Sequence, residues 1–177
     1  MKRILPNHIA AAQTTVRSMS ADRKLKLVDE IFASQPNLLA SVLALGVRKP
    51  LDERVDVVLH ILLVCFEAVR ASGTQLSTIS EVVQEDCLAR IVARIGAIEG
   101  LSPARRSPII ERQLADHNEP FLLSLVLMEL RENGLMGSDS DEEKHFVLTA
   151  LNLAESIAHV ATDDVARPSH SPSENLG

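Results

Sequence analysis

The sequence predicts an all-α protein of about eight helices packed in a single globular bundle. Apolar residues recur at the three- and four-residue spacing of amphipathic helices from one end of the chain to the other. No stretch alternates apolar and polar residues between hairpin turns, the pattern that predicts strands. With 177 residues, the chain is long enough to bury a core without disulfides or a metal. We expect one domain over 1–161 and a disordered tail, rich in Pro and Ser, over 162–177.

Four helices are expected in the first half of the chain, and boundary signals mark the second, third and fourth. Ser20 is a hydroxyl N-cap for the second helix, and Pro36 suits the first turn of the third, where no N–H is needed. The fourth helix starts around Leu51 to Asp52, and Gly73 ends it as the glycine that follows a helix C-terminus. The expected ranges are about 7–18, 20–34, 36–47 and 52–73.

Hydroxyl N-caps, first-turn prolines and terminal glycines mark four more helices in the second half. The eighth opens with a capping box, in which Ser140 and Glu143 satisfy each other's backbone donors, and it ends near Ala161. The other boundary residues are Ser77 or Ser80 and then Gly96 to Gly100 for the fifth helix, Ser107 and Pro108 for the sixth, and Pro120 and Gly134 for the seventh.

The sequence also contains a candidate internal repeat of three helices. Residues 35–43 align with 119–127 at an offset of 84, sharing one Pro, three Leu and one Val, and 58–63 align with 146–151 after a four-residue difference in loop length. Because Leu-rich helices also match by chance, duplication and coincidence both stay open. The pattern predicts two related three-helix units, half-repeats at 20–73 and 104–161, joined by a linking helix at 80–96.

The helix expected at 52–73 is apolar over most of its circumference. Its charged side chains, Arg54 apart, fall in one narrow stripe, so the remaining surface needs cover. That cover is either other helices of the same chain or a second subunit, and an isologous homodimer is the commonest such assembly. For a homodimer we expect the interface at Leu59, Leu62, Leu63 and Phe66.

Charge is distributed unevenly along the chain. The net charge is −6, but residues 1–115 carry 15 basic and 12 acidic side chains, whereas 116–177 carry 3 and 12. A basic cluster at 90–112 has three interpretations: a solvated surface, a dock for an acidic partner, or a DNA reader, which the overall charge disfavours. The expected partner-binding residues are Arg90, Arg94, Arg105, Arg106 and Arg112 on the basic side and Asp141 and Glu142 on the acidic side.

Catalytic motifs are sparse. Gly accounts for only 7 of the 177 residues, and no glycine pattern that cradles phosphates occurs. The spacing of Arg112 to His117, and of Arg54 to His60, resembles the Arg–His pairs that helical ribonucleases of the HEPN type bring together at a dimer interface. The resemblance implies a nuclease or hydrolase in which His117 is the base and Arg112 stabilises charge.

We expect no metal, cofactor or membrane span. Glu142 and His145 have the Glu-x-x-His spacing of di-iron bundles, but no second copy occurs. With four Phe and no Trp or Tyr, stacking of bases or heterocyclic cofactors is disfavoured. The longest apolar run, 57–66, is too short to cross a bilayer. The chain starts without an apolar leader, and Cys65 and Cys87 suit small core positions, so we expect a cytoplasmic protein with reduced thiols.

We therefore expect a non-catalytic helical module, of the adaptor or inhibitor type, that binds another protein. Affinity would come from an apolar groove between helices, and the arginine and acidic patches would orient the partner. Two alternatives remain: a helical hydrolase or nuclease built on the Arg–His pairs, and a regulator associated with nucleic acid.

Overall fold

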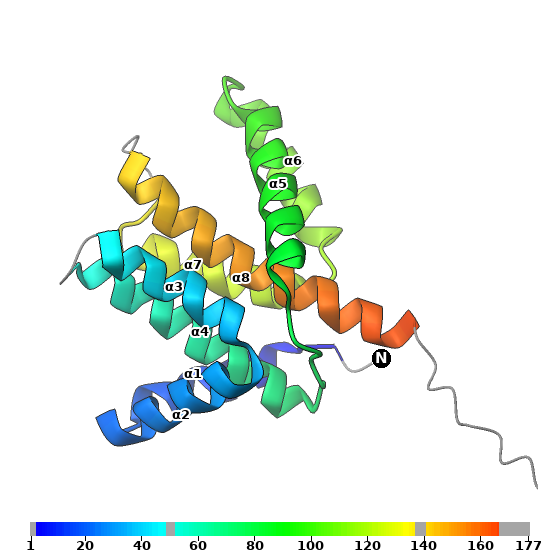
Figure 1. The fold of residues 1–177 in the computed structure, drawn as a ribbon. Helices are drawn as coiled ribbons and strands as arrows, with labels where there is room; N and C mark the ends of the chain where they lie inside the picture. The colour runs from blue at the N-terminus through cyan, green and yellow to red at the C-terminus, as the bar shows by residue number, and fades with distance from the viewer. Residues whose placement is uncertain (1–2, 49–51, 137–140, 167–177) are drawn as a thin grey trace, which may run out of the picture.

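A computed structural model describes residues 3–48, 52–136 and 141–166. Over these residues the chain is all-α, as predicted, with eight helices and no strand (Figure 1). None of the described helices is long and apolar enough to span a membrane. The helices are α1 (Pro6–Ser18), α2 (Ala21–Ser34), α3 (Pro36–Arg48), α4 (Glu53–Ser72), α5 (Glu81–Ile98), α6 (Pro103–Ala115), α7 (Pro120–Glu132) and α8 (Asp141–Ala166).

Most helix boundaries follow the predicted signals. The side chains of Ser20 and Ser80 accept hydrogen bonds from backbone N–H groups in the first turns of α2 and α5, each at 3.3 Å. Asp52 caps α4 in the same way at 3.0 Å. Gly73 ends α4 with a positive φ of 67°, a conformation that glycine adopts without a steric penalty.

Two helices differ in length from the prediction. α6 begins at Pro103, five residues before Pro108, so Pro108 lies inside the helix. Pro103 occupies the first turn, where the preset φ of proline favours helix initiation, and this earlier start escaped the sequence reading. α8 continues past Ala161 to Ala166. Ser140 of the predicted capping box and residues 167–177 of the predicted tail lie outside the described residues.

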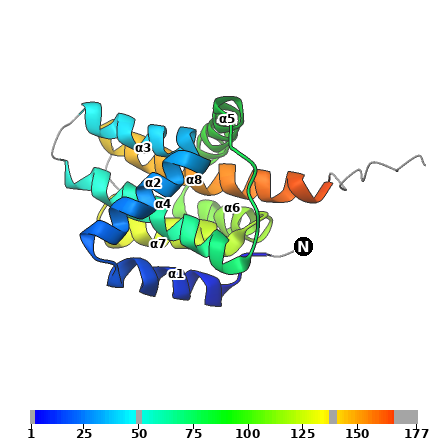
Figure 2. The same cartoon turned by 60° about the horizontal axis from the view of Figure 1, so that its bottom comes forward.

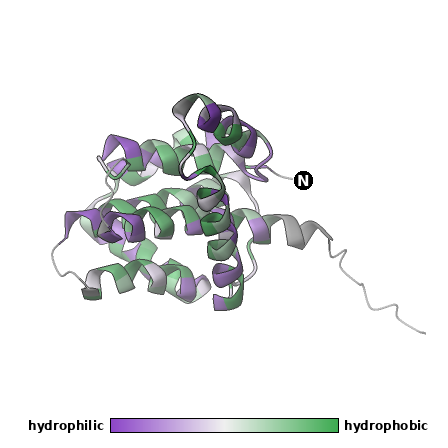
Figure 3. Cartoon of the chain, turned by 90° about the horizontal axis from the view of Figure 1, so that it is seen from above, coloured by the Kyte–Doolittle hydropathy of each residue, from purple (hydrophilic) through white to green (hydrophobic). Residues whose placement is uncertain are grey.

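α4 lies at the centre of the bundle, with α1, α2, α3, α7 and α8 packed on it (Figure 2). Apolar residues run along the packed helices (Figure 3). Leu62 and Leu63 of α4 are 0% and 3% exposed and belong to the core, while Leu59 and Phe66 are half-buried against it. The predicted interface therefore needs correction: the chain itself covers this helix, and Leu62 and Leu63 have no surface left for a second subunit. Homodimerisation stays a prediction.

The two halves of the chain pack by the same plan. α1 packs on α4 as α5 packs on α8, α2 packs on α3 as α6 packs on α7, and α3 packs on α4 as α7 packs on α8. Across the molecule, α3 contacts α8 and α7 contacts α4. Helix α5, expected to be a linker, is the counterpart of α1. The structural unit is thus four helices long, one more than the sequence alignment predicts.

Equivalent hydrogen bonds join the halves at two helix starts. Gln35, which precedes α3, accepts the N–H of Ile79 at 2.9 Å and donates to the carbonyl of Ser77 at 3.0 Å. Glu119, which precedes α7, accepts the N–H of Ile4 at 3.1 Å. Ile4 and Ile79 are both buried, and each lies two residues before the first helix of its half. A side chain of each half therefore holds, by a hydrogen bond, the backbone that leads into the first helix of the other half.

Candidate functional site

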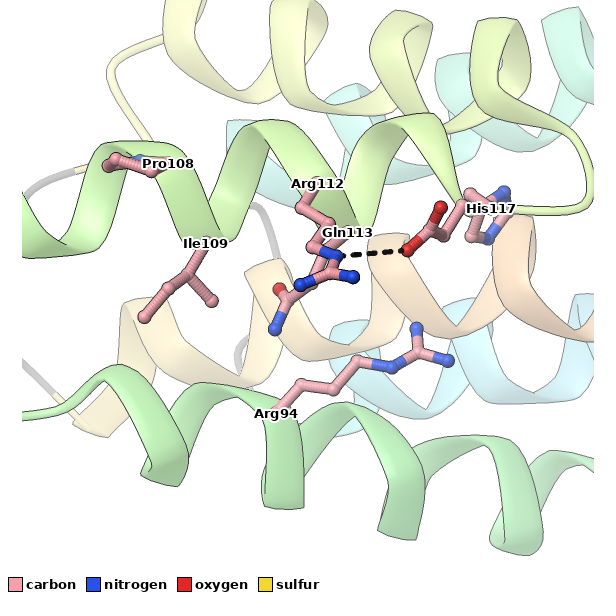
Figure 4. A pocket seen from close by; sticks show the side chains of 7 residues that line it. Arg94, Pro108, Ile109, Arg112, Gln113 and His117 are labelled. Carbon is pink, nitrogen blue, oxygen red and sulfur yellow. Dashed lines mark ion pairs between the residues drawn. The ribbon is translucent and has the colours of Figure 1, made fainter.

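The α5–α6 pair stands out from the rest of the bundle (Figure 1) and borders a cavity of about 560 Å³, the outer groove. In Figure 4 the side chains of Arg94, Ile109 and Arg112 point into the space between the two helices. Sites that bind ligands typically have volumes of this order. The outer groove is lined by Arg94 of α5, by Pro108, Ile109, Arg112 and Gln113 of α6, and by Asp116 and His117 of the turn that follows α6.

A smaller cavity of about 230 Å³, the inner cavity, lies next to the outer groove. The two share Arg94, Asp116 and His117, so they form neighbouring parts of one depression. Helix α8 contributes three residues to the inner cavity. The lining residues are Arg90 and Arg94 of α5, Asp116, His117 and Asn118 of the turn, and Glu155, Ala158 and His159 of α8.

Glu155 is the charged centre of the inner cavity, with a side chain only 11% exposed. The two terminal nitrogens of Arg94 each donate a hydrogen bond of 3.0 Å to a different carboxylate oxygen, a bidentate arrangement. Arg90 Nε lies 3.7 Å from the same carboxylate. Burial raises the pKa of Glu155, but the hydrogen bonds from His117 and Arg94 outweigh burial and lower that pKa to about 2. Glu155 is therefore an anion at neutral pH.

His117 connects Glu155 to the start of α7. Its Nδ1 accepts the backbone N–H of Glu119 at 3.1 Å, so the ring proton resides on Nε2, which donates to Glu155 at 3.0 Å. Both ring nitrogens are engaged, and the side chain is buried. His117 consequently presents no lone pair to either cavity and lacks the geometry of the general base that the Arg–His resemblance implies. Arg112 contacts Asp116, at 3.7 Å, instead.

The second Arg–His pair is not assembled either. The Arg54 guanidinium donates to Asp52 at 2.7 Å and lies 4.8 Å above the centre of the Phe146 ring. His60 lines a separate cavity of about 480 Å³, together with Arg17 of α1 and residues of α7. The two side chains of this pair thus face different neighbours.

The five predicted partner-binding arginines fall into two groups. Arg90, Arg94 and Arg112 line the two cavities. Arg105 and Arg106, on the first turns of α6, are exposed and are not among the lining residues. On the predicted acidic side, Asp141 is exposed at the start of α8 and pairs with Lys144 at 3.1 Å, and the side chain of Glu142 lies outside the described residues.

No protein-family model, curated protein or solved structure matches this chain. Function must therefore be inferred from the geometry of the chain's own residues. Among the described residues, no three His, Cys, Asp or Glu side chains gather in a way that would hold a metal ion. Cys65 and Cys87 are both buried free thiols, as predicted, and burial raises the pKa of Cys65 to about 12.

The outer groove marks a difference between the two halves. In the first half, α2 buries Leu27 and Ile31 and packs on α4 as well as on α3. Its counterpart α6 has no fully buried side chain among its described residues, and Ile109 is 36% exposed. Ile110 and Leu114 of α6 are half-buried, so Ile109 is the large apolar side chain that α6 exposes beside the groove. Helix α2 also exposes apolar side chains, on Leu25 and Phe32.

Glu155 is the central site residue that sequence reasoning missed, and His117 was expected as a general base rather than as the hydrogen-bond partner of Glu155. Glu155 follows Arg94 by 61 positions, so no local spacing connects them. The detectable signal was the pair Arg90 and Arg94, one helical turn apart, which directs two guanidinium groups to the same side of α5.

Proposed function

We propose that this protein is a helical protein-binding module whose outer groove takes an acidic, amphipathic segment of a partner protein. The observation that carries the proposal is the incompletely buried face of α6, where Ile109 lies beside Arg112 and across from Arg94 of α5 (Figure 4). Apolar surface rimmed by charged groups is typical of protein-interaction sites.

The shape of the outer groove favours a peptide segment over a compact small molecule. The α6 residues that line the groove run from Pro108 to Gln113, about 8 Å of helix, which suits one to two turns of a partner helix. Pro108 and Ile109 supply apolar contact, and the Gln113 amide supplies hydrogen bonds in both directions.

The charges of this region favour an acidic partner. α6 carries three arginines and one glutamate. The Arg112–Asp116 pair is highly exposed, so it is weak and readily exchanged for a carboxylate of a partner. A positive surface on a chain of net charge −6 would steer the acidic segment to this face of the molecule.

The test is fluorescence anisotropy with a labelled 13-residue peptide that repeats Glu and Leu at helical spacing. We expect saturable binding that weakens with salt, and a loss of about tenfold for Arg112→Glu and for Ile109→Asp, because each removes one component of the groove. Arg131→Glu is the matched control, since Arg131 is an exposed arginine at the end of α7. Equal losses for Arg112→Glu and Arg131→Glu would contradict specific binding in the groove.

A further inference from the structure

The inner cavity holds an excess of positive charge beside a fixed carboxylate. Arg90 and Arg94 face the single ionised Glu155, which leaves one positive charge uncompensated among these three groups. Asp116 also lines the cavity, but it is exposed and its charge is paired with Arg112. The side chains of Arg90 and Arg94 are each 41% exposed, so a ligand can reach them.

We propose that the inner cavity is an anchor site for one carboxylate of the partner segment, with Arg90 and Arg94 as its ligands and Glu155 as their positioning residue. This inference rests on the proposed function of the adjoining outer groove. The carboxylate would belong to an Asp or Glu side chain or to the C-terminus of the partner.

The donors for such a carboxylate are already oriented. Arg94 uses two of its five N–H groups on Glu155, and the bidentate contact fixes the plane of the guanidinium. Arg90 is held by Cys87, whose sulfur accepts from one terminal nitrogen at 2.9 Å, and by the nearby Glu155 carboxylate. Glu155 is itself held by His117 at 3.0 Å. Donors that are ordered before binding lose less entropy when the ligand arrives.

Charge and volume select a carboxylate over other groups. A cation would be repelled by the two arginines, and a dianionic phosphate would bring two negative charges next to Glu155. One carboxylate balances the single excess charge. The volume of about 230 Å³ is the space of roughly seven or eight waters, enough for one acidic side chain but not for a folded segment.

The experiment repeats the anisotropy titration with the Glu–Leu peptide on Arg94→Gln, Arg90→Gln and the control Arg131→Gln. Arg131 carries the same charge at the end of α7 but lines neither cavity. We expect affinity to fall about tenfold for the two cavity variants and less than about twofold for the control, because a charge-assisted hydrogen bond is lost only in the first two. Circular dichroism and a thermal melt show that each variant is folded at the titration temperature.

Two peptide series identify the source of the carboxylate. In one, each Glu is replaced in turn by Gln, and in the other the free C-terminus is replaced by an amide. We expect one peptide replacement to weaken binding to the wild type but not to Arg94→Gln. That replacement identifies the carboxylate that Arg94 binds. Additive effects for every replacement would overturn the anchor site.

The role of Glu155 is tested by NMR of the Nε–Hε groups of Arg90 and Arg94. In the wild type, sodium acetate should shift these signals at concentrations where sodium chloride does not, and Glu155→Gln should abolish the difference. Glu155→Asp, which keeps the charge, should restore part of it. Equal shifts with acetate and chloride in the wild type would refute the anchor site.

The proposals fail in different ways. If the peptide binds the wild type but all three arginine variants weaken its binding equally, the proposed function of the outer groove is retained and the anchor site is refuted. If the peptide does not bind the wild type, the proposed function falls, and the acetate titration still decides whether the inner cavity takes a carboxylate.

Discussion

The substitution Glu155→Gln tests the electrostatics of the inner cavity with the smallest change in shape. The pKa of Glu155 is lowered from 4.5 to about 2, because the hydrogen bonds from His117 and Arg94 outweigh the cost of burial. Each pKa unit corresponds to about 1.4 kcal/mol, so the ionised carboxylate contributes on the order of 3 kcal/mol to the free energy of unfolding at neutral pH.

The sign of the pH dependence follows from the lowered pKa. A carboxyl whose pKa is lower in the folded state stabilises the fold fully above its unfolded value of 4.5, and this contribution is lost as pH falls toward about 2. Urea denaturation should therefore show Glu155→Gln less stable by about 3 kcal/mol at neutral pH and by roughly half of that near pH 3. Glu111→Gln, at an exposed position of α6, is the control, with an expected change below about 0.5 kcal/mol. A deficit of Glu155→Gln that stays the same at both pH values would refute the electrostatic reasoning and indicate lost packing instead.

Three further predictions concern the fold. Burial raises the pKa of Glu119, so its protonated form favours the folded state and this contribution is lost as pH rises through the folded pKa. Glu119→Gln should therefore raise the melting temperature at neutral pH, and a lower melting temperature would contradict this reasoning. Leu62→Ala should cost about 2–5 kcal/mol in urea denaturation, equally at low and high protein concentration, since Leu62 is core; a concentration dependence would instead indicate a subunit interface. Cys65 and Cys87 should resist a thiol reagent in the native protein and react in denaturant, and rapid native labelling would show that they are accessible.

Helix identity and most helix starts could be predicted from local residues, because capping depends on a few neighbouring groups. Ser20 and Ser80 cap their helices and Gly73 ends α4 as predicted, and Asp52, predicted only to lie near the start of α4, caps it. The start of α6 was predicted too late because the prediction placed Pro108 in the first turn, which Pro103 occupies in the structure.

The candidate site was only partly predictable. Arg90, Arg94 and Arg112 belong to the basic cluster that the sequence indicates, but their separation from Arg105 and Arg106 depends on the direction of α6 and on its distance from α5. Leu62 and Leu63 were assigned to an interface because periodicity identifies an apolar face without identifying what covers it.

By itself, the sequence determined the helical class and the presence of a basic cluster, since both follow from residue types at local spacing, and it left duplication of the two halves an open alternative to coincidence. Only the tertiary structure decided that α5 is the counterpart of α1, that α6 leaves an apolar face partly exposed, and that Glu155 lies between Arg94 and His117. The physical reason is distance along the chain: these contacts join residues tens of positions apart, and the packing of the whole core brings them together.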